Sequence, residues 1–405
     1  MIKNPWRDDF PQIHEGYTYL DTAAMSLKPR VVIEQVERYY SDLSVNVHRS
    51  LYPQGLLATE LYEEVRQRVA GFIHADGEEI VFTRGATSAL NLAAFALQES
   101  LIHEGDEVIT SELEHHSSLL PWQVICQRKQ AVLRYLPLTE SGHITLEGFR
   151  SVLSSKTKVV ALTYVSNVLG YVTPLQEIIH EAHQIGAVVI VDAAQAIQHI
   201  PIDVKQMDVD FLAFSGHKMC GPTGIGILYG KRTWLERLEP IEFGGDMNDE
   251  VTAEHSEWKD IPYKFEAGTM PIASVIGLGA AIDYLSNIGL EKIDSYVRKL
   301  GKYTRTLMKK IPGVKIYNPD SDSGIIAFNI LGVPAHDAVD FFSQNNVAMR
   351  SGHHCAQLVS RFLNIDSCLR ASFYLYNTFE DADVFVKTLE EAVPFFIKMG
   401  FQVII

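Results

Sequence analysis

The stretch "VDFLAFSGHKMCGPTGIGILYG" (209–230) decides the fold class, because an apolar run ends in polar residues and a glycine-rich turn leads into a second apolar run. The first run predicts a buried strand that ends at Ser215-Gly216-His217-Lys218, and the second run predicts another strand. The phosphate-binding motif G-x-x-x-x-G-K-[ST] is missing. A dinucleotide-binding turn is also excluded, since a strand follows the glycines where that motif needs a helix. A single lysine at a strand end is most often solvated, so its neighbours must decide its role.

The surrounding chain, from about residue 60 to 285, alternates predicted helices with short β-branched runs. "KVVALTYVSN" (158–167) and "AVVIVDAAQ" (187–195) read as strands, and "PLQEIIHEAHQIG" (174–186) reads as a helix with a glycine stop. Nearly continuous apolar strands that alternate with helices indicate an α/β fold with a mainly parallel sheet covered on both faces. Ligands of such sheets bind beyond the carboxyl ends of the strands.

The bulk composition excludes several classes of protein. The chain has 405 residues and a formal net charge of −15, which argues against nucleic-acid partners and anionic membrane surfaces. The N-terminus "MIKNPWRDDFPQIHEG" (1–16) lacks the apolar core of a secretory signal, and no apolar run is long enough to span a membrane. The four cysteines are widely spaced without a C-x-x-C pair, so neither a disulfide framework nor a zinc ribbon is expected. We therefore expect a cytoplasmic protein.

The chain is long enough for two domains. The stretch 244–269 is polar, aromatic and irregular, and long excursions of this kind are often functional. A second unit of mixed helices and strands follows residue 285. We predict an N-terminal segment (1–20) that packs with the small domain, a large ligand-binding domain (21–285), and a smaller α+β domain (286–405) that carries the cysteine loop.

Three other sequence features, each at the end of a predicted strand, indicate which ligand Lys218 would bind. Asp192 ends a buried strand, and a buried carboxylate needs a partner. In pyridoxal phosphate enzymes, an Asp binds the ring nitrogen of the cofactor while a lysine forms the Schiff base. "TRGATSALN" (83–91) is a strand-to-helix turn whose N–H groups and Thr87 hydroxyl suit a phosphate. His115 follows a strand and could stack on a flat ring. Each signal alone is weak, since Asp192 could be a cap and His115 a surface residue, but their placement at successive strand ends predicts a pyridoxal phosphate site.

The stretch "RSGHHCAQ" (350–357) raises a separate question about Cys355. Cys355 could be a zinc ligand, an inert core thiol or a nucleophile. Adjacent residues on an extended loop point in different directions, which disfavours zinc. A thiol reacts as the thiolate, which cationic groups favour, and His353 and His354 could supply that environment. Neither histidine can be assigned a role from the sequence.

These stretches, in this order, resemble a known family. The chain is similar to the class V aminotransferase-like enzymes of fold-type I, and within them to the group II (SufS-like) cysteine desulfurases. The resemblance implies a fold-type I pyridoxal-phosphate-dependent transferase fold and covers nearly the whole chain. It is carried by "NVHRS" (46–50), "TRGATSALN", "EHHSSLLPW" (114–122), "VSNVLG" (165–170), "VDAAQA" (191–196), "FSGHKMCGPTGIGILYG" (214–230), "FEAGT" (265–269), "RSGHHCAQ" and "RASFYLYNT" (370–378).

The resemblance implies roles for named residues. Lys218 would be the Schiff-base lysine, Cys355 the nucleophile, and His115 a catalytic residue above the cofactor ring. The other implied cofactor contacts are Asp192 at the ring nitrogen, Gln195 at the phenolate oxygen, Ala86, Thr87, Ser215 and His217 at the phosphate, Asn167, and Thr269 from the other subunit of a homodimer. The implied substrate-binding residues are Arg370, which would clamp the carboxylate, Asn167, His48, Arg49 and Arg350. No metal site is expected.

The implied activity is a cysteine desulfurase that converts L-cysteine to L-alanine. Lys218 would remove the Cα proton, and the Cys355 thiolate would attack the substrate's sulfur and keep it as a persulfide. An acceptor protein of the SufU or SufE type would take the sulfur for iron–sulfur cluster assembly. The short cysteine loop implies a dedicated acceptor, and "RASFYLYNT" resembles members that use the zinc-containing SufU type. The use of L-selenocysteine stays open.

The chain departs from the family pattern at several positions. No proline follows "CAQ", Met270 stands where proline is frequent, Ala86 replaces a frequent threonine, and Cys220 lies close to the lysine. The rival functions are a selenocysteine lyase, another class V lyase or epimerase without a sulfur relay, and a non-catalytic scaffold that binds pyridoxal phosphate. An enzyme without the relay would not need Cys355.

Overall fold

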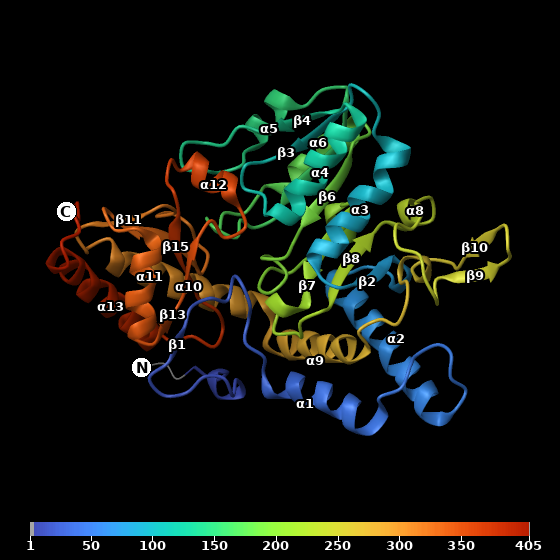
Figure 1. The fold of residues 1–405 in the computed structure, drawn as a ribbon, viewed down its shortest axis with the longest axis horizontal. Coiled ribbons are helices and arrows are strands. Elements are labelled where there is room, and N and C mark those ends of the chain that lie inside the picture. Colours follow the sequence, from blue (N-terminus) through green and yellow to red (C-terminus); the bar gives the residue numbers. More distant parts are fainter. Residues whose placement is uncertain (1–3, 405) are drawn as a thin grey trace.

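A seven-stranded sheet forms the centre of the larger part of the protein in the computed structural model, which describes residues 4–404 (Figure 1). The strand β8 is antiparallel to both of its neighbours, and all other neighbours are parallel, which confirms the predicted mainly parallel sheet. In sheet order the strands are β2 (Ile80–Thr83), β8 (Gly226–Gly230), β7 (Phe211–Ser215), β6 (Val188–Asp192), β5 (Thr157–Thr163), β3 (Glu107–Thr110) and β4 (Val132–Tyr135).

Helices cover both faces of this sheet, as the apolar strands require. In β6, Val188 and Ile190 belong to the core beneath α3 and α4, whereas Val189 and Val191 belong to the core that includes α6 and α9. This alternation is the two-residue period of a strand buried on both faces. The helices of this part are α1 (Arg30–Arg38), α2 (Pro53–Ile73), α3 (Ala86–Leu101), α4 (His116–Lys129), α5 (Leu146–Val152), α6 (Leu175–Gln184), α7 (Val204–Met207), α8 (Arg232–Leu235) and α9 (Ile272–Ile288).

A four-stranded antiparallel sheet organises the C-terminal part of the chain. In sheet order its strands are β11 (Val314–Ile316), β12 (Ile325–Ile330), β15 (Cys368–Ser372) and β14 (Arg350–Gly352). The helices α10 (Leu290–Met308), α11 (Ala335–Gln344) and α13 (Phe379–Lys398) pack with this sheet, and α12 (Gln357–Phe362) follows the cysteine loop. This mixture of helices and strands agrees with the α+β composition expected after residue 285.

The N-terminal segment lies against the C-terminal part. The short strand β1 (Thr18–Tyr19) pairs in parallel with β13 (Val347–Ala348), and the Asn4 side chain donates hydrogen bonds to the carbonyl oxygens of Leu375 and Asn377. Residues 1–3 of the predicted segment 1–20 lie outside the described residues. These long-range contacts tie residues 4–19 to the C-terminal part of the chain.

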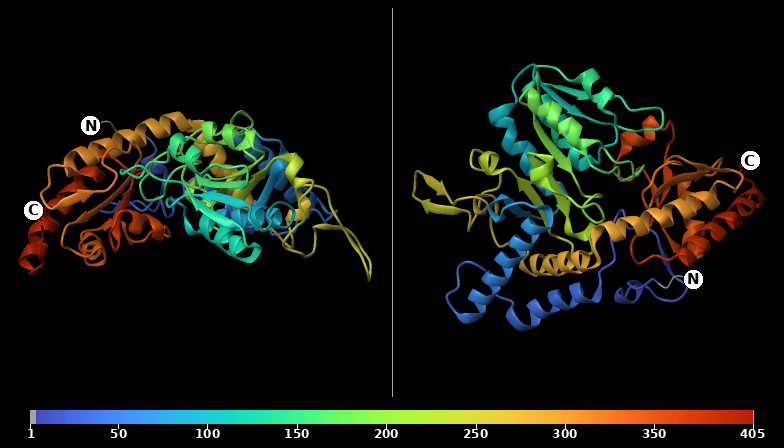
Figure 2. Two further views of the ribbon diagram at one scale, coloured as in Figure 1. Left: turned by 90° about the horizontal axis from the view of Figure 1, so that it is seen from above. Right: turned by 180° about the vertical axis from the view of Figure 1, so that it is seen from behind.

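The helices α9 and α10 form a continuous pair that bends by 76° between Ile288 and Leu290, and Figure 2 shows α10 leading from the large sheet into the C-terminal part. Among residues 4–404, no single helix is long and apolar enough to cross a membrane, and this bent pair passes that test only jointly. The bend falls at Gly289, close to the predicted boundary between 285 and 286. The three domain bounds stay a prediction.

The irregular stretch 244–269 forms a hairpin of β9 (Asn248–Val251) and β10 (Ser256–Trp258), which projects away from the body (Figure 1). Short helical turns complete the described chain. They are the 3₁₀ turns Arg7–Asp9, Gly77–Glu79, Gly216–Lys218 and Tyr263–Phe265, and the π turn Tyr39–Leu43.

Candidate active site

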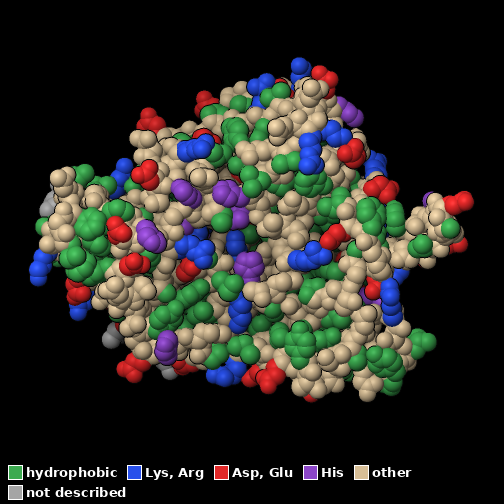
Figure 3. Space-filling model, viewed as in Figure 1, with side chains coloured by type: hydrophobic (Ala, Val, Ile, Leu, Met, Phe, Trp, Pro, Cys, Tyr) green, Lys and Arg blue, Asp and Glu red, His purple; other side chains and the backbone are tan. Residues whose placement is uncertain are grey.

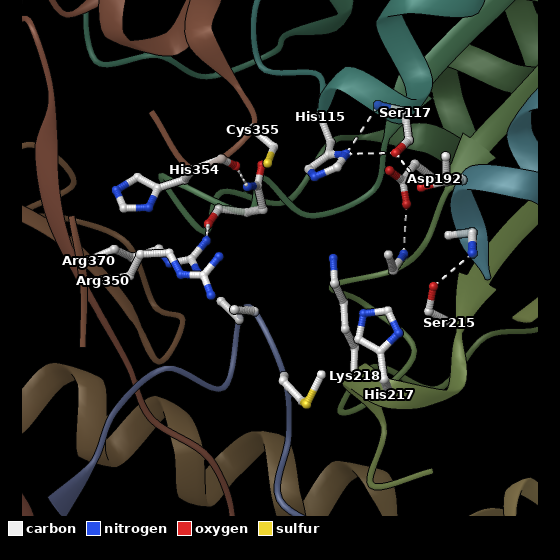
Figure 4. Close-up of a pocket in the computed structure, with 17 residues that line it drawn as sticks. His115, Ser117, Asp192, Ser215, His217, Lys218, Arg350, His354, Cys355 and Arg370 are labelled. Atoms are coloured by element: carbon white, nitrogen blue, oxygen red, sulfur yellow. Dashed lines mark hydrogen bonds between the residues drawn. The ribbon is translucent and has the colours of Figure 1, made fainter. Parts of the chain in front are cut away.

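A cavity of about 210 Å³ lies where the carboxyl ends of β6 and β7 face the C-terminal part of the chain. Figure 3 shows histidine side chains (purple) and basic Lys or Arg side chains (blue) near the middle of this face, and Figure 4 shows the cavity's side chains converging from both parts. Most predicted site residues line it, namely Ala86, Thr87, His115, Asn167, Asp192, Ser215, His217, Lys218, Arg350, Cys355 and Arg370. The remaining lining residues are Ala23, Ala24, Met25, Ser117, Ala194 and His354.

The N-terminus of α3 opens into this cavity and forms an anion cradle. Gly85 caps the helix without a side-chain hydrogen bond, and the Ala86 amide donates to Ser215 Oγ at 2.7 Å. The backbone of Gly226 approaches so closely that a Cβ there would overlap the backbone of Gly85. A helix N-terminus with free N–H groups, flanked by the Thr87 and Ser215 hydroxyls, suits a phosphate group.

Asp192 and Lys218 provide the opposite end of a cofactor site. Asp192 is buried at the end of β6, where one carboxylate oxygen accepts a hydrogen bond from the Ala194 amide at 2.9 Å. Burial raises the pKa of Asp192, and the Lys218 charge opposes this rise. A buried carboxylate that faces a cavity fits the protonated ring nitrogen of pyridoxal phosphate.

Lys218 lies in the turn after β7 and points into the same cavity (Figure 4). Burial lowers the pKa of the Lys218 amine, the Asp192 charge raises it, and the Arg370 charge lowers it. A lysine in this environment loses its proton more readily than an ordinary lysine. The amine is therefore suited to bond covalently with an aldehyde and to accept a proton.

His115 is the N-cap of α4, and its side chain is held by the helix it begins. Its Nδ1 accepts a hydrogen bond from the Ser117 amide at 3.1 Å, and the Ser117 hydroxyl lies 2.7 Å from Thr87 Oγ1. Burial, with the nearby Lys218 charge, lowers the pKa of His115 to about 3. The imidazole is therefore neutral at physiological pH, with its proton on Nε2 because Nδ1 accepts.

A second anion site is formed by Arg370 and its neighbours. The Arg370 guanidinium is buried and donates to the Asn167 carbonyl oxygen at 2.9 Å, while its Nε has no hydrogen-bond partner. The Asn167 side chain donates to the carbonyl oxygen of His354 at 2.7 Å, which connects this site to the cysteine loop. A buried guanidinium that lines a cavity suits the carboxylate of a small ligand.

Cys355 is exposed, in the loop between β14 and α12, and it lines the cavity (Figure 4). Both His354 and Cys355 have a left-handed backbone, with φ of 52° and 55°. This conformation is uncommon outside glycine and holds the thiol on a sharp turn. The reading of Cys355 as an inert core thiol is wrong because the side chain is accessible. No cluster of potential metal ligands is present among residues 4–404.

The two histidines of the loop differ in environment. His354 is buried, its Nε2 lies 3.0 Å from the Cys368 carbonyl oxygen, and burial lowers its pKa to about 3. A neutral His354 supplies no positive charge, so the prediction of a cationic environment from this residue is wrong. His353 is exposed. The positive charge beside Cys355 comes from the arginines that line the cavity.

The other three cysteines are buried, and burial raises their thiol pKa values to about 11 for Cys126 and about 12 for Cys220 and Cys368. They are suited to packing and not to nucleophilic attack. Cys126 and Cys220 pack in the hydrophobic core, and Cys368 lies in strand β15.

Four predicted site residues do not line this cavity. The Gln195 side chain donates to the Ala23 carbonyl oxygen at 2.7 Å, just behind the cavity wall. His48 and Thr269 line a separate cavity of about 250 Å³, and Arg49 forms an ion pair with Asp246 beside it. Within one chain the structure therefore does not bring these last three residues to Lys218.

Sequence reasoning missed the segment 23–25 and Ser117. The segment reaches the cavity through the pairing of β1 with β13, and no local pattern of "DTAAMS" (21–26) indicates this position. Ser117 could have been identified from the sequence, because its hydroxyl lies two residues after His115 and can bind the same phosphate as the turn before α3.

Comparisons with known proteins found similar chains. The family model described as aminotransferase class-V matches residues 18–385. A probable cysteine desulfurase of Halalkalibacterium halodurans is 47% identical over 379 residues, which cover 93% of each chain. The structure of the cysteine desulfurase CsdA from Escherichia coli, in an S-sulfonic acid form, is 38% identical, with a TM-score of 0.91 over 98% of this chain and 100% of that one. The apo cysteine desulfurase of Thermococcus onnurineus is 37% identical, with a TM-score of 0.93 over 97% and 99% of the two chains.

Proposed function

The chain belongs to the class V aminotransferase family, and from that premise we propose that it is a cysteine desulfurase that converts L-cysteine to L-alanine and holds the sulfur on Cys355. One observation carries the proposal. An accessible cysteine on a strained turn lines the same cavity as the buried Asp192, the half-buried Lys218 and the buried Arg370. A lyase without a sulfur relay has no use for that cysteine.

The cofactor of this family is pyridoxal phosphate, and the residues of the cavity fit it. The N-terminus of α3, which has no side-chain cap, would hold the phosphate together with the hydroxyls of Thr87 and Ser215, and Asp192 would hold the ring nitrogen. When bound, the cofactor accepts the electrons released when an amino acid loses its Cα proton. We also assign His115 to the face of the ring and Gln195 to the phenolate oxygen.

We assign substrate binding and proton transfer to three residues. Arg370, which lines the cavity, would hold the carboxylate of L-cysteine, and the Asn167 amide would lie beside it. The neutral amine of Lys218 takes the Cα proton, which its lowered pKa permits. The burial that excludes water from Arg370 strengthens its attraction to the carboxylate.

The sulfur step is a displacement at the substrate's sulfur atom. The Cys355 thiolate attacks that sulfur, a sulfur–sulfur bond forms, and the Cβ–S bond breaks. The electron pair of the broken bond stays on the carbon skeleton, which takes up a proton and leaves as L-alanine. Cys355 keeps the sulfur as a persulfide, so no external oxidant or reductant enters the step.

A homodimer is proposed on two observations. Apolar side chains around α1 and α2 are exposed, with Leu51 at 91% and Leu56 at 54% of their free surface, and such patches mark interaction surfaces. The cavity of His48 and Thr269 lies outside the Lys218 cavity of the same chain. We propose that these two residues, with Arg49, complete the site of a second copy.

The persulfide needs an acceptor, which we propose to be a protein of the SufU or SufE type that serves iron–sulfur cluster assembly in the cytoplasm. Cys355 is exposed, which supports delivery to a macromolecule. Adding each purified acceptor to the turnover assay would identify it, since the cognate protein raises the rate of alanine formation without added thiol. Cell fractionation would test the location.

The function is tested by supplying L-cysteine and a thiol reductant to the protein loaded with pyridoxal phosphate. We expect equal molar amounts of alanine and sulfide from the parent protein and neither from Cys355→Ala. L-selenocysteine separates the alternatives, because selenide leaves without help from a thiolate. An enzyme without a sulfur relay would keep in the variant whatever activity the parent protein has on each substrate, whereas a desulfurase would keep only the selenocysteine activity. Cofactor absorbance without any turnover would instead support the scaffold function.

A further inference from the structure

Asp21 bridges the two arginines that line the cavity. Its Oδ1 accepts a hydrogen bond from Arg370 Nη2 at 3.2 Å, and its Oδ2 lies 3.2 Å from Arg350 Nε and 3.1 Å from Arg350 Nη2. Asp21 itself is not among the residues that line the cavity. It follows β1, in the segment whose next residues form part of the cavity wall.

The position of Asp21 relative to the two arginines is fixed because its segment and the arginines are all held by β15. The Ser372 amide donates to the Leu20 carbonyl oxygen at 2.7 Å, and the Ser372 hydroxyl accepts from the Ala23 amide at 2.9 Å. Arg350 and Arg370 are directly paired across β14 and β15. Asp21 is therefore held at a fixed position between two side chains of like charge.

The charges of this cluster leave one positive charge for a ligand. Two guanidinium groups and one carboxylate sum to one positive charge, which matches the single carboxylate of a neutral amino acid. Arg370 is buried, whereas Arg350 is half exposed and reaches the cavity from the cysteine-loop side. Arg370 would bind the carboxylate of the substrate. Asp21 pairs with the guanidinium of Arg350, which without this partner would attract an acidic side chain of a substrate.

We propose that Asp21 determines substrate specificity by neutralising Arg350, so that the cavity accepts amino acids with an uncharged side chain and rejects those with an acidic one. This inference rests on the proposed function only in that it uses the same amino acid site. A purely structural role, relief of repulsion between two paired arginines, is the alternative.

The test compares two ligands in the protein loaded with pyridoxal phosphate. Dissociation constants of L-alanine and L-aspartate are measured by calorimetric titration in the parent protein and in Asp21→Asn, which keeps the shape of the side chain. Removing one negative charge beside a half-exposed guanidinium should raise the preference for L-aspartate over L-alanine about tenfold. The ratio of the two dissociation constants is independent of any effect of Asp21→Asn on the carboxylate site, because both ligands use that site.

Two further variants isolate the cause. Asp283→Asn changes the net charge equally, at an exposed ion pair with Arg68, and should leave the ratio unchanged. Asp21→Asn combined with Arg350→Gln should show the parent protein's preference between L-aspartate and L-alanine, since the guanidinium that Asp21→Asn would free is absent. An unchanged ratio in Asp21→Asn, or a loss of L-alanine binding along with L-aspartate binding, would overturn the proposal in favour of a structural role. Sulfide release from L-cysteine is measured separately, so a failure of the desulfurase function is seen independently of this ratio.

Discussion

The main-chain amide of His116 donates a hydrogen bond of 2.7 Å to the carbonyl oxygen of Cys355. The bond joins the first turn of α4, next to His115, to the turn that carries the thiol. The His116 side chain adds a second link, since its Nε2 lies 3.3 Å from the Gln357 amide. The cysteine loop is thereby held at a fixed distance from the residues that surround the proposed cofactor ring.

His115 combines two features that substitution can separate, a flat ring and a helix cap. His115→Phe keeps the ring and loses the cap, and His115→Asn keeps a capping side chain and loses the ring. If the imidazole serves as a stacking surface, pyridoxal phosphate should bind about tenfold more weakly to the Asn variant than to the Phe variant. Equilibrium titration by cofactor absorbance measures both. Equal affinities would show that stacking contributes nothing.

Arg370→Lys tests the carboxylate site. Lysine keeps the charge but lacks the planar fork, so KM for L-cysteine should rise about tenfold, a loss of about 1.4 kcal/mol, with a smaller change in kcat. Arg361→Lys, on α12 and outside the cavity, is the matched control and should leave both constants unchanged. A fall in kcat with constant KM would place Arg370 in the chemical step and not in binding.

Gly226 is predicted to be essential for cofactor affinity. A Cβ in Gly226→Ala would overlap the backbone of Gly85 and displace the N-terminus of α3, so pyridoxal phosphate should bind at least about tenfold more weakly. Gly71→Ala in α2 is the control, because a Cβ there meets no atom within 4 Å. Unchanged affinity in Gly226→Ala would mean that the cradle does not hold the phosphate.

Glu114 predicts a pH dependence of stability. It is buried beside His115, where its Oε1 accepts from the Ser111 hydroxyl at 2.7 Å and from the Thr163 amide at 3.0 Å. Burial raises the pKa of Glu114 to about 7. The folded protein therefore binds a proton that the unfolded chain releases near pH 4.5, so this group lowers stability as pH rises from about 4.5 to 7, by up to about 3 kcal/mol.

Urea unfolding midpoints at pH 5 and pH 8 measure this effect. Glu114→Gln should lose less stability than the parent protein between the two pH values, whereas Glu177→Gln, which is exposed on α6, should follow the parent protein. If the stability of Glu114→Gln depended on pH in the same way as that of the parent protein, Glu114 would not be the cause of the pH dependence.

The sheet and most of the cavity could be predicted from the sequence because both depend on local patterns. Runs such as 159–162 are apolar throughout, and the carboxyl ends of parallel strands meet at one edge, which brings Asp192 and Ser215 together. Asp21 could not be predicted, since it reaches the arginines through long-range contacts, namely the pairing of β1 with β13 and its own bridge to Ser372 of β15. The neutral state of His354 also required the structure, because burial by the C-terminal sheet causes it.

The central claim is that Cys355 receives the substrate's sulfur, and the most direct measurement is the mass of the peptide that contains this residue. The protein loaded with pyridoxal phosphate is mixed with L-cysteine without reductant or acceptor, alkylated, digested and analysed by mass spectrometry. We predict one additional sulfur atom on the Cys355 peptide, with alanine formed in equal molar amount and Cys126, Cys220 and Cys368 unmodified. Alanine formation with an unmodified Cys355 peptide, or unchanged turnover in Cys355→Ala, would contradict the claim.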